Sequence, residues 1–313
     1  MPIPTLLVAT WGGGLFTVAG DAVHHQFAGQ TIASMVADGR GGLFAIVGGH
    51  SLRRRSPAGE WHVIAESESP LSCCVPLGDN IFVGTDDAQI LRVDPDGTPH
   101  RLAGFDTVPG RDRWYAGAAM IDGVLMGPPL GIRSMAATAD GAVLLANVHV
   151  GGIPRSTDGG RTWQPTIEID SDVHQVRAHP TRPDIVAAAA AAGLCISRDA
   201  GATWTIEQDG LHASYCSAVA FSGDEILVAA STDHFAREGA VYRRQLDGEG
   251  PLERLAGIPQ WIEGIVDTGC IAAQDGTIIV IDRSGNIHMI RDDKLVRSHA
   301  LGRDVVPNGL FLP

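Results

Sequence analysis

The chain has little of what marks several common classes of function. Only 5% of its 313 residues are aromatic, so a broad aromatic binding stripe is not expected. Lys294 is the single lysine, which leaves Schiff-base catalysis with one candidate, in a segment that reads as an exposed turn. No apolar run reaches the roughly 18 residues that a membrane helix needs. No Gly-rich loop opens a helix after a strand, and there is no Gly-x-Ser-x-Gly elbow.

Positive charge is also scarce. Lys and Arg number 23 against 36 Asp and Glu, which gives a formal charge of −13. An acidic chain repels phosphate backbones and anionic lipids, so neither nucleic acid nor membrane is expected as a partner.

Cysteine usage points away from a disulfide framework. The count is odd, the spacing is irregular, and the N-terminus has no basic stretch followed by an apolar segment. We therefore expect a reduced, cytoplasmic protein with thiols at Cys73, Cys74, Cys195, Cys216 and Cys270.

What the chain does contain is a repeated motif. Ser156-Thr-Asp-Gly-Gly-Arg-Thr-Trp163 is followed 41 residues later by Ser197-Arg-Asp-Ala-Gly-Ala-Thr-Trp204. In such a turn, Asp accepts hydrogen bonds from backbone amides, Gly allows positive φ, and Trp anchors the returning strand. A period near 40 residues, with each unit made of short strands, is typical of a β-propeller blade.

The strand patterns predict seven blades. Six complete four-strand units begin near residues 32, 72, 133, 173, 215 and 269. Thr5–Thr10 begins as a second strand, and Pro307–Leu312 supplies its missing innermost strand, so the two termini should close the ring. We expect an all-β, seven-bladed propeller of four-stranded antiparallel blades that forms a single domain over residues 1–313; six blades is the alternative count. The segment 105–132 is longer than its counterparts and is either a lid over one mouth or an inert excursion.

With these residues set out, the chain resembles the BNR or Asp-box repeat propellers. Val148–Ser156 and Asp172–Pro180 further resemble a group of bacterial cytoplasmic BNR-like proteins that are often labelled glycosyl hydrolases. The superfamily includes sialidases, sortilin-type receptors and photosystem II assembly factors, so the resemblance implies a fold and no particular activity. A sialidase is not expected, because Ile153-Pro154-Arg155 has its arginine on the wrong side and no Tyr is paired with a Glu.

Polar residues should gather at one mouth of the ring. The blade register brings the loops after second strands and the starts of innermost strands to this mouth, and histidines at positions 50, 149, 174 and 234 fall there. We predict catalytic roles for His149, His174 and Tyr215. Residues expected to bind substrate are Trp11, His50, Arg133, Asn147, Cys216, His234, Trp261, Glu263 and Asp267.

Three interpretations of this mouth remain open. The imidazoles could bind a transition metal such as Zn, Fe or Cu, with open positions for substrate. Alternatively, His149 or His174 is a general base beside Tyr215, acting on a small molecule in a hydrolase or lyase. The histidines could also be loop residues satisfied locally, on a non-catalytic scaffold that binds or assembles protein partners through a propeller face. Cys216 has its own alternative as a small core residue.

Overall fold

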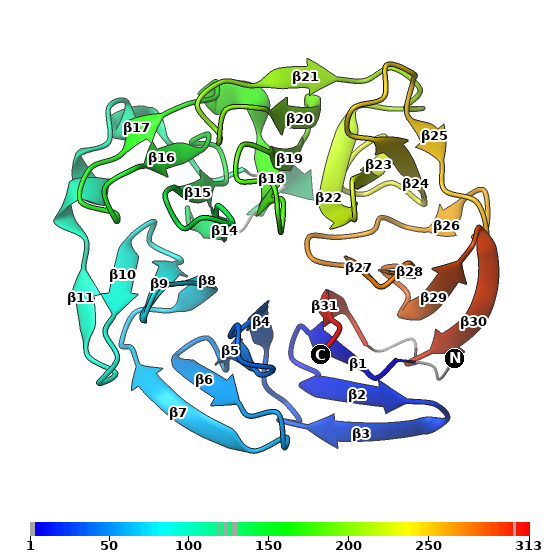
Figure 1. The fold of residues 1–313 in the computed structure, drawn as a ribbon, viewed down its shortest axis with the longest axis horizontal. Helices are drawn as coiled ribbons and strands as arrows, with labels where there is room; N and C mark the ends of the chain where they lie inside the picture. Colours follow the sequence, from blue (N-terminus) through cyan, green and yellow to red (C-terminus); the bar gives the residue numbers. More distant parts are fainter. Residues whose placement is uncertain (1–3, 118, 122–123, 127–129, 303–304) are drawn as a thin grey trace.

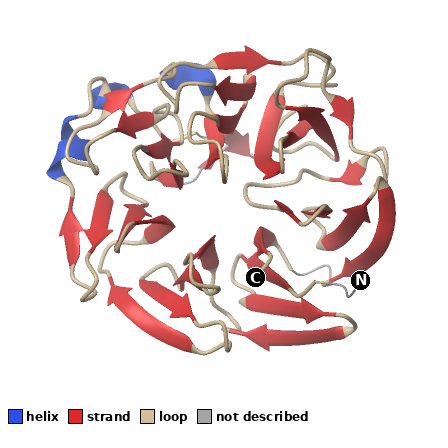
Figure 2. Ribbon diagram, viewed as in Figure 1, coloured by secondary structure: helices blue, strands red, loops and turns tan. Residues whose placement is uncertain are grey.

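The computed structural model describes residues 4–117, 119–121, 124–126, 130–302 and 305–313. Seven four-stranded antiparallel sheets stand radially around a central axis (Figure 1). Strands dominate the described residues, and the helical segments are the short 3₁₀ turns η1 (Ala103–Thr107), η2 (Arg111–Arg113) and η3 (Ile169–Ser171), which lie along one side of the ring (Figure 2). The seven-bladed propeller expected from the sequence is confirmed.

Six blades follow the chain in order, from the innermost strand to the outermost. Blade 1 consists of β4 (Ile32–Ala37), β5 (Leu43–Val47), β6 (Ser51–Arg55) and β7 (Trp61–Glu66). Blade 2 consists of β8 (Leu71–Leu77), β9 (Asn80–Thr85), β10 (Ile90–Val93) and β11 (Pro99–Arg101). Blade 3 consists of β14 (Ile132–Ala137), β15 (Leu144–Val148), β16 (Pro154–Ser156) and β17 (Gln164–Pro165). Blade 4 consists of β18 (Val173–Ala178), β19 (Val186–Ala190), β20 (Gly193–Ser197) and β21 (Thr205–Glu207). Blade 5 consists of β22 (Tyr215–Ser222), β23 (Glu225–Ser231), β24 (Glu238–Gln245) and β25 (Glu253–Arg254), with β26 (Ile262–Glu263) added beside β24. Blade 6 consists of β27 (Ile271–Gln274), β28 (Thr277–Ile281), β29 (Asn286–Arg291) and β30 (Lys294–Ala300).

The seventh blade joins the two ends of the chain. Its innermost strand is β31 (Pro307–Phe311), which pairs with β1 (Leu6–Thr10), and β2 (Leu15–Ala19) and β3 (Ala22–Gln26) complete it. Val8 pairs with Leu310, and both are buried in the core between blades. The sheet order places the last strand of the chain inside the first, as the sequence predicted.

The repeated motif forms the turn between the third and fourth strands of blades 3 and 4. The Asp158 carboxylate accepts the Thr162 amide at 2.9 Å and the Thr162 hydroxyl at 2.7 Å. Trp163 is 2% exposed, and its indole N–H donates to the Gly160 carbonyl at 2.9 Å. Asp199 and Thr203 repeat the first pair of contacts in blade 4. The motif therefore stabilises a turn on the outer side of the ring.

A second repeated feature lies at the axis. In six blades one extra residue bulges from the innermost strand near its start, at Ala33, Ser72, Arg133, His174, Ser217 and Asn308. Four of these side chains donate to a backbone carbonyl of the next blade: Ser72 to Ile132, His174 to Cys216, Ser217 to Val266 and Asn308 to Ile32. Because a bulge redirects its side chain, this position ties neighbouring blades together at the axis. We call this contact the interblade bond.

Two remaining expectations concern the cysteines and membrane-spanning segments. All five cysteines are free and buried, in agreement with the absence of a disulfide framework. Among the described residues, no helix has the length and apolar character that would let it cross a membrane.

Candidate functional site

A cavity of about 860 Å³ opens at one mouth of the ring. Its lining comes from loops after second strands and from the starts of innermost strands, which is where the blade register placed the candidate residues. Trp11 follows β1, His149 follows β15, His234 follows β23, and Tyr215 begins β22. A second cavity of about 920 Å³ fills the central channel and shares Trp11, Arg133 and Asp267 with the mouth.

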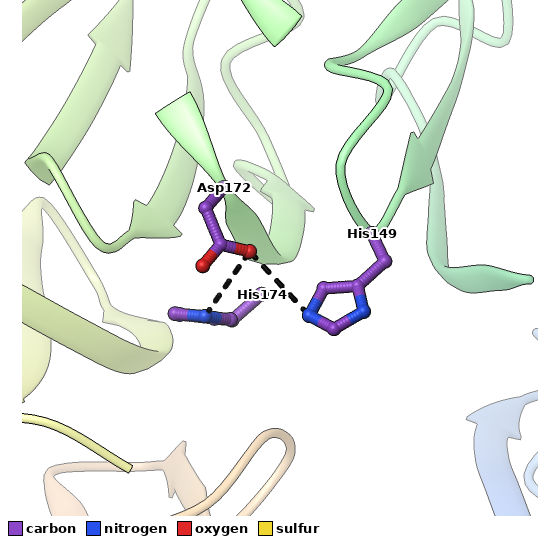
Figure 3. Close-up of side chains that lie close together, drawn as sticks. All are labelled: His149, Asp172 and His174. Carbon is purple, nitrogen blue, oxygen red and sulfur yellow. Dashed lines mark ion pairs between the residues drawn. The ribbon is translucent and has the colours of Figure 1, made fainter. Parts of the chain in front are cut away.

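Three side chains converge at this mouth (Figure 3). The Asp172 Oδ1 atom lies 3.4 Å from His149 Nε2 and 3.6 Å from His174 Nε2. The side chains of His149 and His174 are 8% and 3% exposed, and that of Asp172 is 31% exposed. The Tyr215 ring packs 4.6 Å from the His174 ring. The structure thus brings together the three residues for which catalytic roles were predicted, around a carboxylate that was not predicted.

The backbone explains how each member is held. His149 directly follows β15, whose five residues are all buried. Asp172 ends η3 with φ 48° and ψ 74°, a left-handed conformation that Asp tolerates better than most residues. His174 is the bulged residue of β18 and makes the interblade bond of that blade. Regular elements therefore fix His149 and His174, and a single unusual backbone conformation sets Asp172 between them.

The interblade bond determines which nitrogen of His174 carries a proton. His174 Nδ1 lies 2.6 Å from the Cys216 carbonyl oxygen, which can only accept, so Nδ1 carries the hydrogen. In the neutral ring Nε2 then has a free lone pair. This buried atom has no hydrogen-bond partner among the described residues, and neither does Asp172 Oδ1, which faces it. Two acceptors thus oppose each other, an arrangement that a proton or a donor group placed between them would stabilise.

His149 has the opposite tautomer. The Gly117 amide donates to His149 Nδ1 at 3.1 Å, so the neutral ring carries its hydrogen on Nε2, which lies 3.4 Å from Asp172 Oδ1 without making a hydrogen bond to it. Burial and the positive charge of Arg133 lower the pKa of His149 to about 4. His149 is therefore neutral near pH 7 and acts as a hydrogen-bond donor toward the cavity.

The other two groups keep their usual charge states. Burial alone would raise the pKa of Asp172. A hydrogen bond and positive charge from His174 and the charge of His149, which act when these rings are protonated, together with Arg133 outweigh burial, so the pKa is lowered and the carboxylate stays ionised. Burial raises the pKa of the Tyr215 phenol above its ordinary value, so that Tyr215 remains a protonated donor. The mouth therefore combines one carboxylate, one free imidazole lone pair and two proton-bearing donors.

The three converging atoms also have the spacing of a metal site, since they lie within 4.8 Å of one another. His174 fits such a site, because a ligating His normally donates its other ring N–H to a carbonyl. His149 does not fit: its Nδ1 accepts the Gly117 amide, which leaves Nε2 protonated instead of free to ligate. The hydrogen bonds favour proton transfer over metal binding.

Of the residues predicted to bind substrate, Trp11, Arg133, His234 and Asp267 line the mouth cavity. His234 also accepts, through its carbonyl, a hydrogen bond from Arg283. Whether these four residues contact a substrate stays a prediction.

The other five lie outside the cavity lining. His50 is exposed on blade 1, where its ring contacts the Ser67 carbonyl. Asn147 is buried within blade 3, and Trp261 packs on His212 and Arg254 at the flank of blade 5. Glu263 is exposed on β26, where that added strand pairs with β24. The Cys216 thiol is buried in the core, where burial raises its pKa, and the residue serves the site through its carbonyl, so the core alternative is the one observed.

The sequence interpretation missed Asp172. A signal was available, because Asp172 precedes the paired start of β18 just as Tyr215 precedes Cys216 in blade 5. Applying the same register to both blades would have placed Asp172 at the mouth. Gly117 was also missed; a Cβ there would lie 2.4 Å from the His149 ring, so the close approach requires glycine.

The long insertion reaches the site in part. Trp114 packs on Phe105, Tyr115 bridges to Val150, and Tyr115 and Gly117 line the mouth cavity. The hairpin of β12 (Ala119–Ile121) and β13 (Val124–Met126) follows. Residues 118, 122–123 and 127–129 lie outside the described part of the chain, and the lid interpretation of 105–132 stays a prediction.

Comparison with known proteins identifies the fold only. No protein-family model and no curated protein matches the chain. Among solved structures, a candidate 6-phosphogluconolactonase from Bacteroides uniformis aligns with a TM-score of 0.65 at 12% identity, covering 98% of both chains. The WD40 propeller domain of Doa1 aligns at 0.61 and 12% identity, over 98% of this chain and 95% of that one. An ancestral GH74 enzyme aligns at 0.60 and 13% identity over 96% of this chain, which spans 40% of the length of that enzyme. At these identities the likeness shows a β-propeller.

Proposed function

We propose that the protein is an enzyme of the hydrolase or lyase class that acts on a small polar molecule by acid–base catalysis at the histidine-lined mouth. The observation that carries this proposal is the buried pair of unpartnered acceptors, Asp172 Oδ1 and His174 Nε2, beside a cavity of small-molecule size that Asp172 and His149 line. Buried polar atoms without hydrogen-bond partners lower the stability of a fold. Their presence is explained where a substrate or a transferred proton forms the missing hydrogen bond.

In the proposed mechanism His174 is the general base. Its Nε2 lone pair takes a proton from a substrate O–H or C–H, or from a water, and the electron pair of that bond stays with the oxygen or carbon. The imidazolium formed lies 3.6 Å from the Asp172 carboxylate, which stabilises the positive charge. His149 Nε2–H and the Tyr215 hydroxyl supply hydrogen bonds to negative charge that develops on the substrate. No metal takes part in these steps.

A second candidate function is a non-catalytic scaffold, and one observation favours it. Trp11, Tyr115 and Phe235 line the mouth and are each more than half exposed, as an interaction surface for a protein partner would be. The same rings would also cover a bound small molecule, so activity decides between the two functions.

Family and compartment belong to this proposal as well. Membership of the BNR or Asp-box propellers is supported by the hydrogen bonds of Asp158 and Asp199 within their turns. A cytoplasmic location is supported by five free cysteines. Enzyme names among the structural neighbours are compatible with an enzyme but transfer no activity.

The test compares wild-type protein with the His174→Asn variant in small-molecule extracts followed by mass spectrometry. Asn308 makes the interblade bond in blade 7, so Asn at 174 should keep that bond while removing the base. The proposal expects a metabolite that gains or loses one water with wild type and not with the variant. If no metabolite changes with wild type, or if the change persists in the variant, the proposed function is wrong.

A further inference from the structure

Arg133 is the exception among the bulged residues. It occupies in blade 3 the position that His174 occupies in blade 4, yet it makes no interblade bond. Ala33 also lacks one, but only because its methyl group has no donor. Arg133 has five N–H donors and forms no hydrogen bond or ion pair with any residue that the structure describes. Arg133 is half-buried at the axis, and its donors are free to bind a ligand.

The position of Arg133 indicates what that is. Arg133 lines both the mouth cavity and the channel cavity, at their junction. Its positive charge is among the causes that lower the pKa of His149 and of Asp172, so it acts on the same group of side chains. β14 and β18 are innermost strands of adjacent blades, so Arg133 and His174 occupy matching positions one blade apart, and Asp172 beside His174 lines the same mouth cavity as Arg133.

The other arginine at the mouth is already engaged. Arg283 donates to the His234 carbonyl at 3.2 Å, whereas Arg133 keeps its full donor capacity. A guanidinium with free donors in a partly buried site binds a carboxylate through two parallel hydrogen bonds. An unpaired charge that has lost part of its hydration is also stabilised by an anion.

The charge of the lining limits how much negative charge a ligand can carry. The mouth cavity is lined by two arginines, Arg133 and Arg283, and by five carboxylates: Asp170, Asp172, Asp233, Asp267 and Asp282. A phosphate dianion or a polycarboxylate would be repelled by this surplus of negative charge. A single carboxylate can pair with Arg133, provided that the rest of the molecule is neutral. The hydroxyls and amides of the channel lining, such as Ser34, Gln30 and Asn308, suit a hydroxylated remainder.

We infer that Arg133 anchors the carboxylate of a small hydroxylated monocarboxylic acid, with the atom that loses its proton placed close to that carboxylate, within reach of His174 Nε2. This inference rests on the proposed function, because it names the substrate class of the same site. It assigns Arg133 a binding role, which can be measured without turnover.

Binding of lactate, gluconate and inorganic phosphate is measured by calorimetry and by NMR titration of the His149 ring. A carboxylate on Arg133 neutralises the charge that lowers the pKa of His149, so lactate or gluconate should raise that pKa in wild type. The Arg133→Ala variant should bind at least about tenfold more weakly, since charge-assisted hydrogen bonds are lost. Arg133→Lys should restore part of the affinity, which separates loss of charge from damage to β14. Arg283→Ala, the matched control at the mouth, should weaken binding clearly less than Arg133→Ala does, because Arg283 is engaged with the His234 carbonyl.

Two outcomes would overturn the inference. One is that neither carboxylate binds wild type, or that Arg133→Ala leaves the affinity and the His149 shift unchanged. The other is that phosphate binds more tightly than both carboxylates. Failure of the proposed function has a different signature: the carboxylates bind through Arg133, and no reaction depends on His174.

Discussion

At the scale of single residues, His174 combines two tasks on two ring nitrogens. Nδ1 carries the interblade bond to Cys216, a bond that Ser72 and Asn308 make at equivalent positions with no chemistry attached. Nε2 is left buried and unpartnered beside Asp172. A purely structural role would explain the first nitrogen and leave the second without purpose. Substitutions can separate the two tasks because other blades show which side chains satisfy the bond.

His174→Asn should keep the free energy of unfolding within about 1 kcal/mol of wild type, because Asn can still donate to the Cys216 carbonyl. His174→Ala should be less stable than His174→Asn, by about 0.5–1.5 kcal/mol for the lost hydrogen bond and more for the space left behind. Denaturant unfolding measures both. Ser217→Ala is the control for loss of an interblade bond at a residue that lines neither cavity, and it should retain function. Equal stability of His174→Asn and His174→Ala would contradict the structural task assigned to Nδ1.

His149 should make the stability depend on pH. Its pKa is about 4 in the folded protein, well below that of an unfolded histidine, so the unfolded chain binds more protons between these values. Stability contributed by neutral His149 is therefore complete above about pH 6.5 and is lost as the pH falls toward 4, at no more than about 1.4 kcal/mol per pH unit. Thermal unfolding of wild type and His149→Gln across this range measures the effect. The slope should be shallower in the variant; parallel curves would show that His149 is not the group responsible.

At the scale of elements, the two copies of the turn motif are similar in sequence but unequal in burial. Trp163 is among the fully buried side chains and packs on Phe105 at 5.2 Å, whereas Trp204 is only partly buried and donates to the Thr166 hydroxyl. The difference arises because η1 of the insertion covers blade 3 and not blade 4. The insertion thus stabilises the motif turn of blade 3.

Trp163→Ala should destabilise the protein by about 3–5 kcal/mol, in the range of large aromatic truncations in cores. Trp204→Ala should lower the free energy of unfolding by clearly less, because the Trp204 ring is only partly buried. Denaturant midpoints of the two variants provide the comparison. A larger loss for Trp204→Ala would mean that the insertion does not support blade 3 as described.

The same scale shows what the sequence could predict. Blade number, strand order and the closing strand followed from alternation and from a turn motif with a fixed period, because both are local patterns. The cluster was only partly predictable. His149 and Tyr215 were placed by register, and the same register applied to blade 4 would have placed Asp172, although its left-handed backbone conformation is not visible in the strand pattern. His50 and Trp261 lie on loops and Glu263 lies on the added strand β26, all outside the cavity lining. Where such connecting segments lie depends on packing between blades, which no single-strand pattern records.

At the scale of the whole molecule, one strand closes the ring. β31 is held between β1 and the axis, and Asn308 ties it to the Ile32 carbonyl of blade 1. Without β31, β1 would expose a long apolar edge. This edge would lie next to Trp11, Arg133 and Asp267, the residues that line both the mouth cavity and the channel cavity. Closure therefore stabilises both the fold and the mouth.

Removal of residues 307–313 should lower the melting temperature strongly and promote association through the freed edge of β1. Removal of Pro313 alone, an exposed residue beyond β31, should leave both properties unchanged. Thermal unfolding with size-exclusion chromatography measures the two variants. A monomeric truncated protein with wild-type stability would show that the terminal strand does not hold the ring.

The protonation pattern of the two cluster histidines tests the acid–base assignment most directly, and it is read from ¹⁵N shifts of the ring nitrogens near neutral pH, with and without added Zn²⁺. We expect neutral His149 with its hydrogen on Nε2 and His174 with its hydrogen on Nδ1, and no change with Zn²⁺. If instead both rings carry hydrogen on Nδ1 and their Nε2 resonances respond to Zn²⁺, the cluster binds metal and the acid–base assignment is wrong.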